Sequence, residues 1–251
     1  MRHTARRSVA RAADGALAQF QSFRLGRRMV YLRRELALKA PAIVAVLGRL
    51  GAAKGGGNRM SGVPLKLDDG TELFARLNRR GGLIAYLSKD LYFGLSSRPL
   101  RELAVATEAR QRGIPVVEPI GAMVEWVAPI IYRSIFLTRP LSGMNLWEFL
   151  RLDDDPFVRA HIVEQARGAI DTMHRLGLFH ADLNLHNLFV TKSRESLAVV
   201  ILDLDKARLL AGPLPQSMRE RNLARLQRSV RKLDPGGHYL DSHALELLTA
   251  L

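Results

Sequence analysis

Two short runs in this chain hold the residue types that phosphoryl transfer to an alcohol requires. Residues 180–187 read His-Ala-Asp-Leu-Asn-Leu-His-Asn, and residues 201–205 read Ile-Leu-Asp-Leu-Asp. In that reaction one carboxylate accepts the proton of the attacking hydroxyl, while an amide oxygen and a second carboxylate hold Mg²⁺. The pattern therefore predicts Asp182 as the general base and Asn187 and Asp203 as metal ligands.

Neighbouring polar residues leave several alternatives open. Asp205 either shares a strand face with Asp203 and adds charge to the site, or caps the turn that follows. His180 opens the first run, either as a structural histidine that bonds backbone carbonyls or as an acid–base group. His186 occupies a variable position and is compatible with simple exposure. A metal cluster of His180, Asp182 and His186 is a further alternative, which the spacing supports little.

The first run fits H-x-D-L-x-x-x-N, the catalytic-loop pattern of kinases, and its flanking elements suit that assignment. Apolar residues recur at spacings of one, three and four over residues 157–176, which predicts an amphipathic helix ended by Gly177. A short strand is expected at 188–190 and another at 197–202, with Asp203 at the end of the second. These elements would bring both carboxylates to one site.

The preceding half of the chain is rich in expected strands. Residues 63–67 and 72–77 flank an Asp-Gly turn and predict a β-hairpin, with Pro64 near a strand start. A helix is expected at 98–112, closed by Gly113, followed by strands at 116–127 and 130–137. The chain would then cross at 138–143 into a helical half. The sequence predicts an α+β, protein-kinase-like fold with a β-rich N-lobe, a helical C-lobe and a cleft between them.

Such a fold needs a cation for the nucleotide phosphates in its β-rich half. Arg76 lies on the second strand of the predicted hairpin, and Glu102 lies in the helix that follows. A guanidinium binds phosphate through two donors, so we expect Arg76, oriented by Glu102, to serve as the phosphate-binding cation. The run Gly55-Gly56-Gly57 offers backbone N–H groups to phosphates, or is only a linker, since it does not match G-x-G-x-x-G.

Composition bounds the remaining possibilities. The 251 residues contain no cysteine, which excludes disulfides and thiolate chemistry, and no apolar run long enough to span a membrane. The formal charge of +14 favours a polyanionic partner. Residues 1–34 contain nine Arg and one acid, and read as a transit-like segment, a basic arm or a plain extension. We expect a partly helical basic extension at 1–50, with apolar spacing at 15–50 broken by Pro41, an N-lobe at 51–140 and a C-lobe at 141–251.

Six runs follow one another in an order that resembles one lipopolysaccharide kinase family. The family is the 3-deoxy-D-manno-octulosonic acid (Kdo) kinases of Gram-negative bacteria, which are related to the core-heptose kinases. The resemblance covers the chain from about residue 54 to its end, although Gly57-Asn58-Arg59 stands where the family has Gly-Arg-Gly. The runs are residues 79–83, 98–102, 113–116, 180–187, 203–205 and 221–229.

The resemblance implies ATP- and Mg²⁺-dependent phosphorylation of a Kdo hydroxyl, typically O-4, on the lipid A inner core. It implies action at the cytoplasmic face of the inner membrane. By position it assigns Asp182 as the base, Asn187 and Asp203 as metal ligands, and Arg76 with Glu102 as the phosphate-orienting pair.

The last part of the chain predicts a helix with one apolar and one basic face. If residues 222–233 are helical, Arg221, Arg225 and Arg228 lie opposite the leucines. This face would contact Kdo-lipid A, or a related acidic saccharide, and the anionic membrane surface that holds it. A solvated helix face is the plainer interpretation. The competing functions are another small-molecule or core-heptose kinase of the same fold and, after it, a non-catalytic nucleotide-binding scaffold. We expect no nucleic-acid partner because no such binding motif is present.

Overall fold

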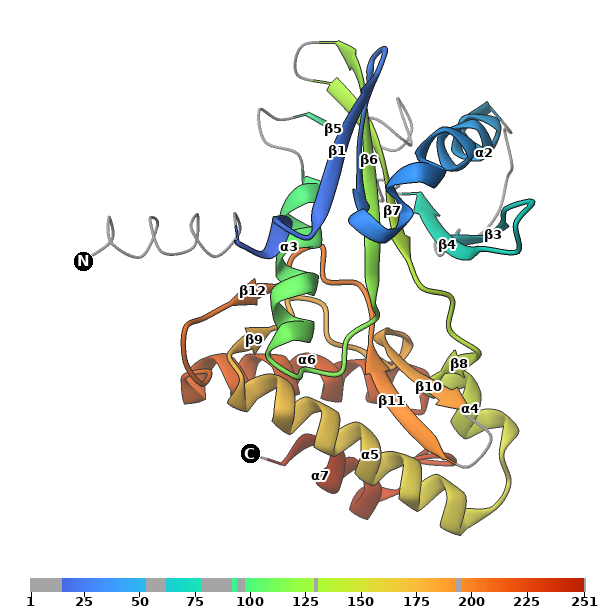
Figure 1. The fold of residues 1–251 in the computed structure, drawn as a ribbon. Helices are drawn as coiled ribbons and strands as arrows, with labels where there is room; N and C mark the ends of the chain where they lie inside the picture. Colours follow the sequence, from blue (N-terminus) through green and yellow to red (C-terminus); the bar gives the residue numbers. More distant parts are fainter. Residues whose placement is uncertain are drawn as a thin grey trace. The chain divides into compact units, whose positions relative to one another are not determined.

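The computed structural model describes residues 15–52, 62–77, 92–93, 98–128, 131–192 and 196–250. The chain divides into two compact units (Figure 1). Unit 1 comprises residues up to Thr107 together with Glu118–Pro140, and unit 2 comprises Glu108–Val117 together with Leu141–Leu251. The boundary after Pro140 falls inside the crossing predicted at 138–143.

Unit 1 is built on an antiparallel sheet that has seven strands in the described residues. Its order is β1-β2-β6-β7-β4-β3, with the short β5 paired to β7. The strands are β1 (Phe20–Leu25), β2 (Arg28–Arg33), β3 (Gly62–Lys66), β4 (Glu72–Leu77), β5 (Tyr92–Phe93), β6 (Pro119–Ala128) and β7 (Ile131–Thr138).

The hairpin predicted from the Asp-Gly turn is confirmed as β3 and β4. Gly70 adopts φ 82°, a left-handed conformation that a residue with a Cβ rarely takes. The Leu67 and Thr71 backbones close the turn, with Leu67 N donating to Thr71 O over 2.9 Å. Pro64 lies in β3 at the edge of the sheet, where its missing N–H costs no ladder bond. The hairpin places Arg76 on β4 beside β7.

The helical interpretation of residues 15–50 is wrong for residues 20–33. They form β1 and β2, and β2 pairs with β6, so these residues belong to the sheet and not to a separate extension. Val30 and Leu32 are fully buried on β2, and the less buried Tyr31 and Arg33 alternate with them. This is the period-two pattern of a strand, which the density of arginines obscured.

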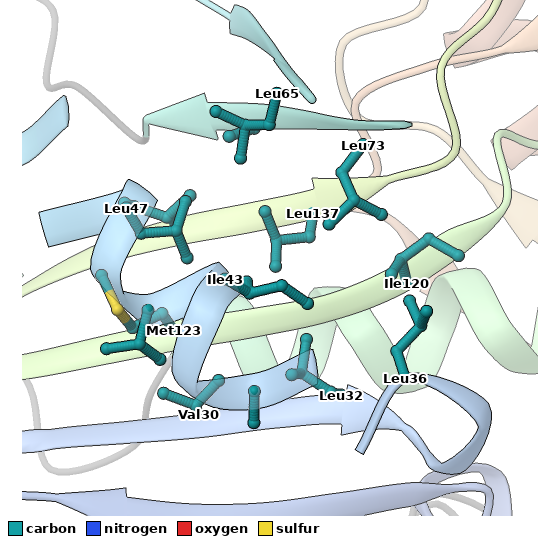
Figure 2. Packing of buried hydrophobic residues seen from close by; sticks show 14 of the residues in the cluster. Val30, Leu32, Leu36, Ile43, Leu47, Leu65, Leu73, Ile120, Met123 and Leu137 are labelled. Atoms are coloured by element: carbon teal, nitrogen blue, oxygen red, sulfur yellow. The ribbon is translucent and has the colours of Figure 1, made fainter. Parts of the chain in front are cut away.

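The rest of that segment covers one face of the sheet. A 3₁₀ helix, η1 (Arg34–Lys39), leads into the α-helix α2 (Ala40–Ala52), and Pro41 lies in the first turn of α2. Figure 2 shows Ile43 and Leu47 of α2 over Leu137 of the sheet. The cluster also holds Val30, Leu32, Leu36, Leu65, Leu73, Ile120 and Met123. This core fixes the strands that carry Arg76.

Helix α3 (Arg98–Gln111) confirms the helix expected at 98–112 and contains the boundary between the units. It begins with Pro99 in its first turn, and the following Gly113 has φ 86°. Glu102 lies in the part that belongs to unit 1.

Unit 2 combines helices with two small antiparallel sheets (Figure 1). One sheet has the order β11-β10-β8, and the other pairs β12 with β9. The helices are α4 (Leu146–Leu152), α5 (Pro156–Arg175), α6 (Gln216–Leu233) and α7 (Ser242–Thr249). The strands are β8 (Gly143–Asn145), β9 (Leu178–Phe179), β10 (Leu188–Lys192), β11 (Leu197–Ile201) and β12 (Arg208–Leu209).

Helix α5 matches the predicted amphipathic helix closely. Asp155 caps its start, with Oδ1 accepting from Phe157 N at 2.8 Å and from Val158 N at 3.4 Å. Gly177 follows its end at φ 85°, where an added Cβ would lie 2.3 Å from Gly212 O. The sharp turn at this glycine sends the chain into β9 and the first of the two functional runs.

Candidate active site

Residues 180–187, the first functional run, form a loop between β9 and β10. Side chains of the loop hydrogen-bond its own backbone. Asn184 caps the 3₁₀ helix η3 (Leu185–Asn187), accepting from His186 N at 2.9 Å and from Asn187 N at 3.2 Å. The Asn184 amide also donates to Asp182 O at 2.8 Å. The backbone that carries Asp182 is therefore held from within the loop.

Asn187 is buried and has a fixed amide orientation. Its Nδ2 donates to Asp182 O at 2.8 Å, which orients Oδ1 as the end of the amide available to a ligand. An amide oxygen is a ligand that Mg²⁺ accepts, so the donor set at this position fits a hard cation.

His180 is a structural residue with one defined tautomer. Its Nε2 lies 2.8 Å from Leu202 O, which can only accept, so Nε2 carries the proton. Its Nδ1 accepts from Asp182 N at 3.2 Å. Burial lowers the pKa of His180, although the Leu202 carbonyl and the Asp203 and Asp182 carboxylates act in the opposite direction. A neutral imidazole therefore links the two functional runs.

Leu202 connects the second run to the first through both of its backbone groups. Its carbonyl accepts from His180, and its N–H donates to Asn187 O over 2.9 Å. Strand β11, which precedes it, is held by residues 115–117, with Ile201 N donating to Pro115 O over 2.7 Å. Asp203 is thereby placed beside the loop that carries Asp182 and Asn187.

Asp203 lies two residues beyond the end of β11, so the expectation that it ends the strand is corrected. It has φ 58°, and in the described part of the chain it is the one non-glycine residue with positive φ. Such a backbone costs about 1 kcal/mol or more and concentrates at functional sites. Aspartate tolerates this conformation better than most residues, because its short side chain bonds locally.

Asp205 does not share a strand face with Asp203. Residues 204–207 form a turn in which Ala207 N donates to Leu204 O over 3.0 Å, and Asp205 occupies its second position. The turn interpretation is therefore the one that the backbone supports. It turns the chain away from β11 towards β12.

The alternative metal cluster of His180, Asp182 and His186 is not formed. Both ring nitrogens of His180 are engaged by the backbone. Among the described residues, no group of three or more His, Asp or Glu side chains is arranged to hold a metal ion.

Asp182 is paired with Arg225 of α6, which sequence reasoning had placed among the substrate and membrane contacts. Arg225 Nε donates to Asp182 Oδ1 at 2.8 Å, and Arg225 Nη2 donates to the same oxygen. About half of each side chain is exposed to solvent, at 48% for Asp182 and 46% for Arg225. The Asp182 carboxylate is therefore partly accessible to solvent.

Helix α6 also supports the loop through two residues that sequence reasoning missed. Asn222 is buried, donates through Nδ2 to His180 O at 2.6 Å, and accepts from His180 N at 3.3 Å. Ser229 Oγ accepts from Leu185 N at 3.4 Å. An Asn among leucines on an otherwise apolar helix face was the available clue, because buried amides are normally hydrogen-bonded.

Arg76 and Glu102 form the ion pair that the sequence predicted. Arg76 Nη2 donates to Glu102 Oε1, and Glu102 is 2% exposed. Opposite Arg76 on β7 lies Phe136, whose ring centroid is 5.5 Å from the guanidinium carbon. The pair therefore holds a cation in a defined place on β4.

Other predicted residues have simpler surroundings or lie outside the structure's description. Arg221 stacks on Phe179, with 5.7 Å between the guanidinium carbon and the ring centroid. Arg228 is exposed on α6. Gly55, Gly56 and Gly57 lie outside the described residues.

Within the described part, no helix combines the length and apolar character needed to cross a bilayer.

Comparison with known proteins gives matches of sequence and of fold. The model of the lipopolysaccharide kinase (Kdo/WaaP) family matches residues 50–244. A 3-deoxy-D-manno-octulosonic acid kinase of Xylella fastidiosa (strain 9a5c) is 35% identical over 162 residues, which cover 63% of this chain and 61% of the relative. The matched part thus spans about three fifths of that relative's length. A kinase of the same name from Vibrio vulnificus (strain YJ016) is 29% identical over 176 residues, covering 68% and 71%.

A solved structure supports the fold alone. The Rio2 kinase of Chaetomium thermophilum, in its ADP/Mg²⁺-phosphoaspartate complex, aligns with a TM-score of 0.52 at 14% identity. The alignment covers 98% of this chain and 76% of that one. The predicted kinase-like α+β fold is thereby confirmed.

The buried histidines make stability depend on pH. Burial lowers the pKa of His174 to about 4, while its bond to Asn222 acts in the opposite direction. In the unfolded chain His174 takes up a proton near pH 6.5, whereas in the folded chain it does so only near pH 4. The contribution of His174 to stability is therefore fully present above pH 6.5 and is lost as the pH falls towards 4. We expect the free energy of unfolding, measured by urea titration, to fall as pH drops from 7 to 5.

His174→Gln tests this origin of the pH dependence, because glutamine keeps an N–H donor without a titrating ring. The slope of unfolding free energy against pH should become shallower in this variant by up to about 1.4 kcal/mol per pH unit. His161→Gln, at an exposed position of α5, is the control and should leave the slope unchanged. An unaltered slope in His174→Gln would contradict the assignment.

Proposed function

Because the chain belongs to the lipopolysaccharide kinase (Kdo/WaaP) family, we propose that it is an ATP-dependent kinase that phosphorylates a Kdo hydroxyl of the lipid A inner core. O-4 is the expected position. The observation that carries the proposal is the link through Leu202, which holds Asp203 beside the loop bearing Asp182 and Asn187. A nucleotide-binding scaffold has no need of that arrangement.

Asp182 is the general base in this proposal. Its backbone is fixed by bonds from Asn184, Asn187 and its own N–H to His180, whereas its carboxylate is half exposed. A rigid backbone with an accessible side chain suits a group that must meet an incoming hydroxyl. In phosphoryl transfer the protein chiefly orients the reactants and stabilises charge, so correct placement is the main demand on this residue.

Asn187 Oδ1 and the Asp203 carboxylate are the proposed ligands for Mg²⁺. The magnesium nucleotide supplies the phosphoryl group and neutralises charge on its oxygens when bound. Arg76, held by Glu102, is the proposed phosphate-binding cation, since a guanidinium offers two parallel donors to phosphate oxygens. The backbone N–H groups of Gly55, Gly56 and Gly57 remain the predicted phosphate loop.

The exposed face of α6 is the proposed contact with the membrane surface. Arg221, Arg225 and Arg228 recur at helical spacing on the exposed side, while Leu223 and Leu226 are buried on the other. A cationic stripe attracts the phosphates of lipid A and an anionic leaflet. We propose peripheral association with the cytoplasmic side of the inner membrane on this basis.

Asp182→Asn should lower the turnover number by about 10²- to 10⁴-fold, because the amide cannot accept the hydroxyl proton. Nucleotide binding, measured by calorimetry, and thermal unfolding should stay close to wild type. Asp154→Asn makes the same chemical change at a 98%-exposed aspartate of unit 2 and should retain activity. Turnover like wild type in Asp182→Asn would remove this residue from the mechanism.

The acceptor is identified by mass spectrometry of lipopolysaccharide core from cells with and without the protein. We expect the core to lose one phosphate on Kdo when the protein is absent, and to regain it with wild type but not with Asp182→Asn. A phosphate lost from heptose would assign the chain to core-heptose phosphorylation instead. An unchanged core would reject the proposed function.

Removing Arg221 and Arg228 together should weaken binding to vesicles that contain phosphatidylglycerol. Each contributes about 1 kcal/mol near an anionic surface, so the double alanine variant should bind roughly tenfold to thirtyfold more weakly in a sedimentation assay. Arg225 is left intact because it contacts Asp182. The control removes two exposed charges of unit 1, Arg24 and Lys66. Equal losses in the two double variants would reject a specific membrane face on α6.

A further inference from the structure

One arginine of α6 differs from its neighbours because it bonds the proposed base. Arg225 directs Nε and Nη2 at a single oxygen, Asp182 Oδ1, with Nε at 2.8 Å. The other two arginines of that face have different surroundings, since Arg221 stacks on Phe179 and Arg228 is exposed. Arg225 therefore lies beside the carboxylate that the acceptor hydroxyl approaches in the proposed reaction.

The helix beneath Arg225 is firmly held. Asn222 and Leu226 lie on either side of it in sequence, are buried at 1% and 0% exposure, and anchor this turn of α6. Asn222 bonds both backbone groups of His180, two residues before Asp182. The Arg225 backbone is thus fixed relative to the loop, while its guanidinium stays in contact with solvent.

The ion pair itself is too exposed to serve mainly as a stabilising contact. Pairs between half-exposed charges contribute about 0–1 kcal/mol, because water competes for both partners. Such a pair is easily exchanged for another anion. Asp182 is already positioned by its backbone, so the guanidinium is not required to hold the loop.

We infer that Arg225 binds the carboxylate of the acceptor and selects acidic sugars over neutral ones. The inference rests on the proposed function and adds the group that recognises the substrate. A sugar acid that brings a ring hydroxyl to Asp182 also brings its carboxylate close to the guanidinium beside that base. A guanidinium binds carboxylates through two donors, so Arg225 can exchange Asp182 for the carboxylate of the acceptor.

This exchange gives the pair of the base with a cation a role in acceptor binding. An acidic acceptor replaces one carboxylate–guanidinium contact by another and leaves Asp182 Oδ1 available for the hydroxyl proton. A neutral acceptor has no anion to offer, so reaching Asp182 leaves Arg225 without a compensating partner. The site therefore discriminates by charge at the step of acceptor binding.

Two acceptors that differ in one group test the inference. A Kdo glycoside and its C1 carboxamide share every hydroxyl, and the second lacks the negative charge. With wild-type protein we expect kcat/KM to favour the acid by about 10- to 100-fold, the range of a charge-assisted pair. Arg225→Ala should bring the ratio close to one by raising KM for the acid, with KM for ATP unchanged. Arg225→Lys should retain part of the preference.

Arg231→Ala is the matched control, since it removes an exposed arginine from the same helix without an assigned contact, and it should keep the wild-type ratio. Thermal unfolding of each variant checks that it folds. If Arg225→Ala lowers kcat equally for both acceptors, Arg225 only positions Asp182 and the inference is overturned. If wild type phosphorylates both equally well, the inference fails while the proposed function stands. If wild type phosphorylates neither, the proposed function itself fails.

Discussion

The hydrogen bond between His180 Nε2 and Leu202 O joins the two runs that carry the proposed chemistry. Its donor–acceptor distance is 2.8 Å, and the His180 side chain is buried. The N–H of Leu202 donates to Asn187 O. The backbone of Leu202 is therefore held through both its N–H and its carbonyl, and Asp203 follows it directly. Because burial keeps the imidazole neutral, Nδ1 remains free of a proton and can accept from Asp182 N. Charge on this ring would break the acceptor side of the link.

Helix α6 supplies a second constraint on the same loop from far along the chain. Asn222 satisfies both the N–H and the carbonyl of His180, and Ser229 receives the N–H of Leu185. Burying an amide is unfavourable unless its polar atoms are bonded, and here the bonds fix the start of the loop. The run at residues 221–229 thus combines support for the loop through buried residues with a cationic outer face.

Local patterns predicted most of the elements that hold the site, whereas most of the long-range contacts between those elements escaped them. The hairpin at β3 and β4 and the helices α3 and α5 were readable, because turn glycines and periodicity are local properties. The pair of Arg76 with Glu102, 26 positions apart, was predicted from the needs of a kinase-like fold and not from a local pattern. Strand β2 was missed because its alternation is short and arginines flank it on both sides, and β1 was missed because its burial does not alternate. The contact of Arg225 with Asp182 joins residues 43 positions apart, and no local pattern specifies such a pairing.

Two arginine–carboxylate pairs in this chain show how burial changes the role of one interaction. Glu102 is 2% exposed, and a buried carboxylate is costly to leave without a charged partner, so its bond with Arg76 is strongly favoured. Asp182 is 48% exposed, and its pair with Arg225 contributes at most about 1 kcal/mol. The first pair fixes a cation on a sheet, whereas the second is weak enough to yield to an incoming anion. Rigidity at Asp182 therefore resides in its backbone bonds, and the carboxylate remains available to exchange partners.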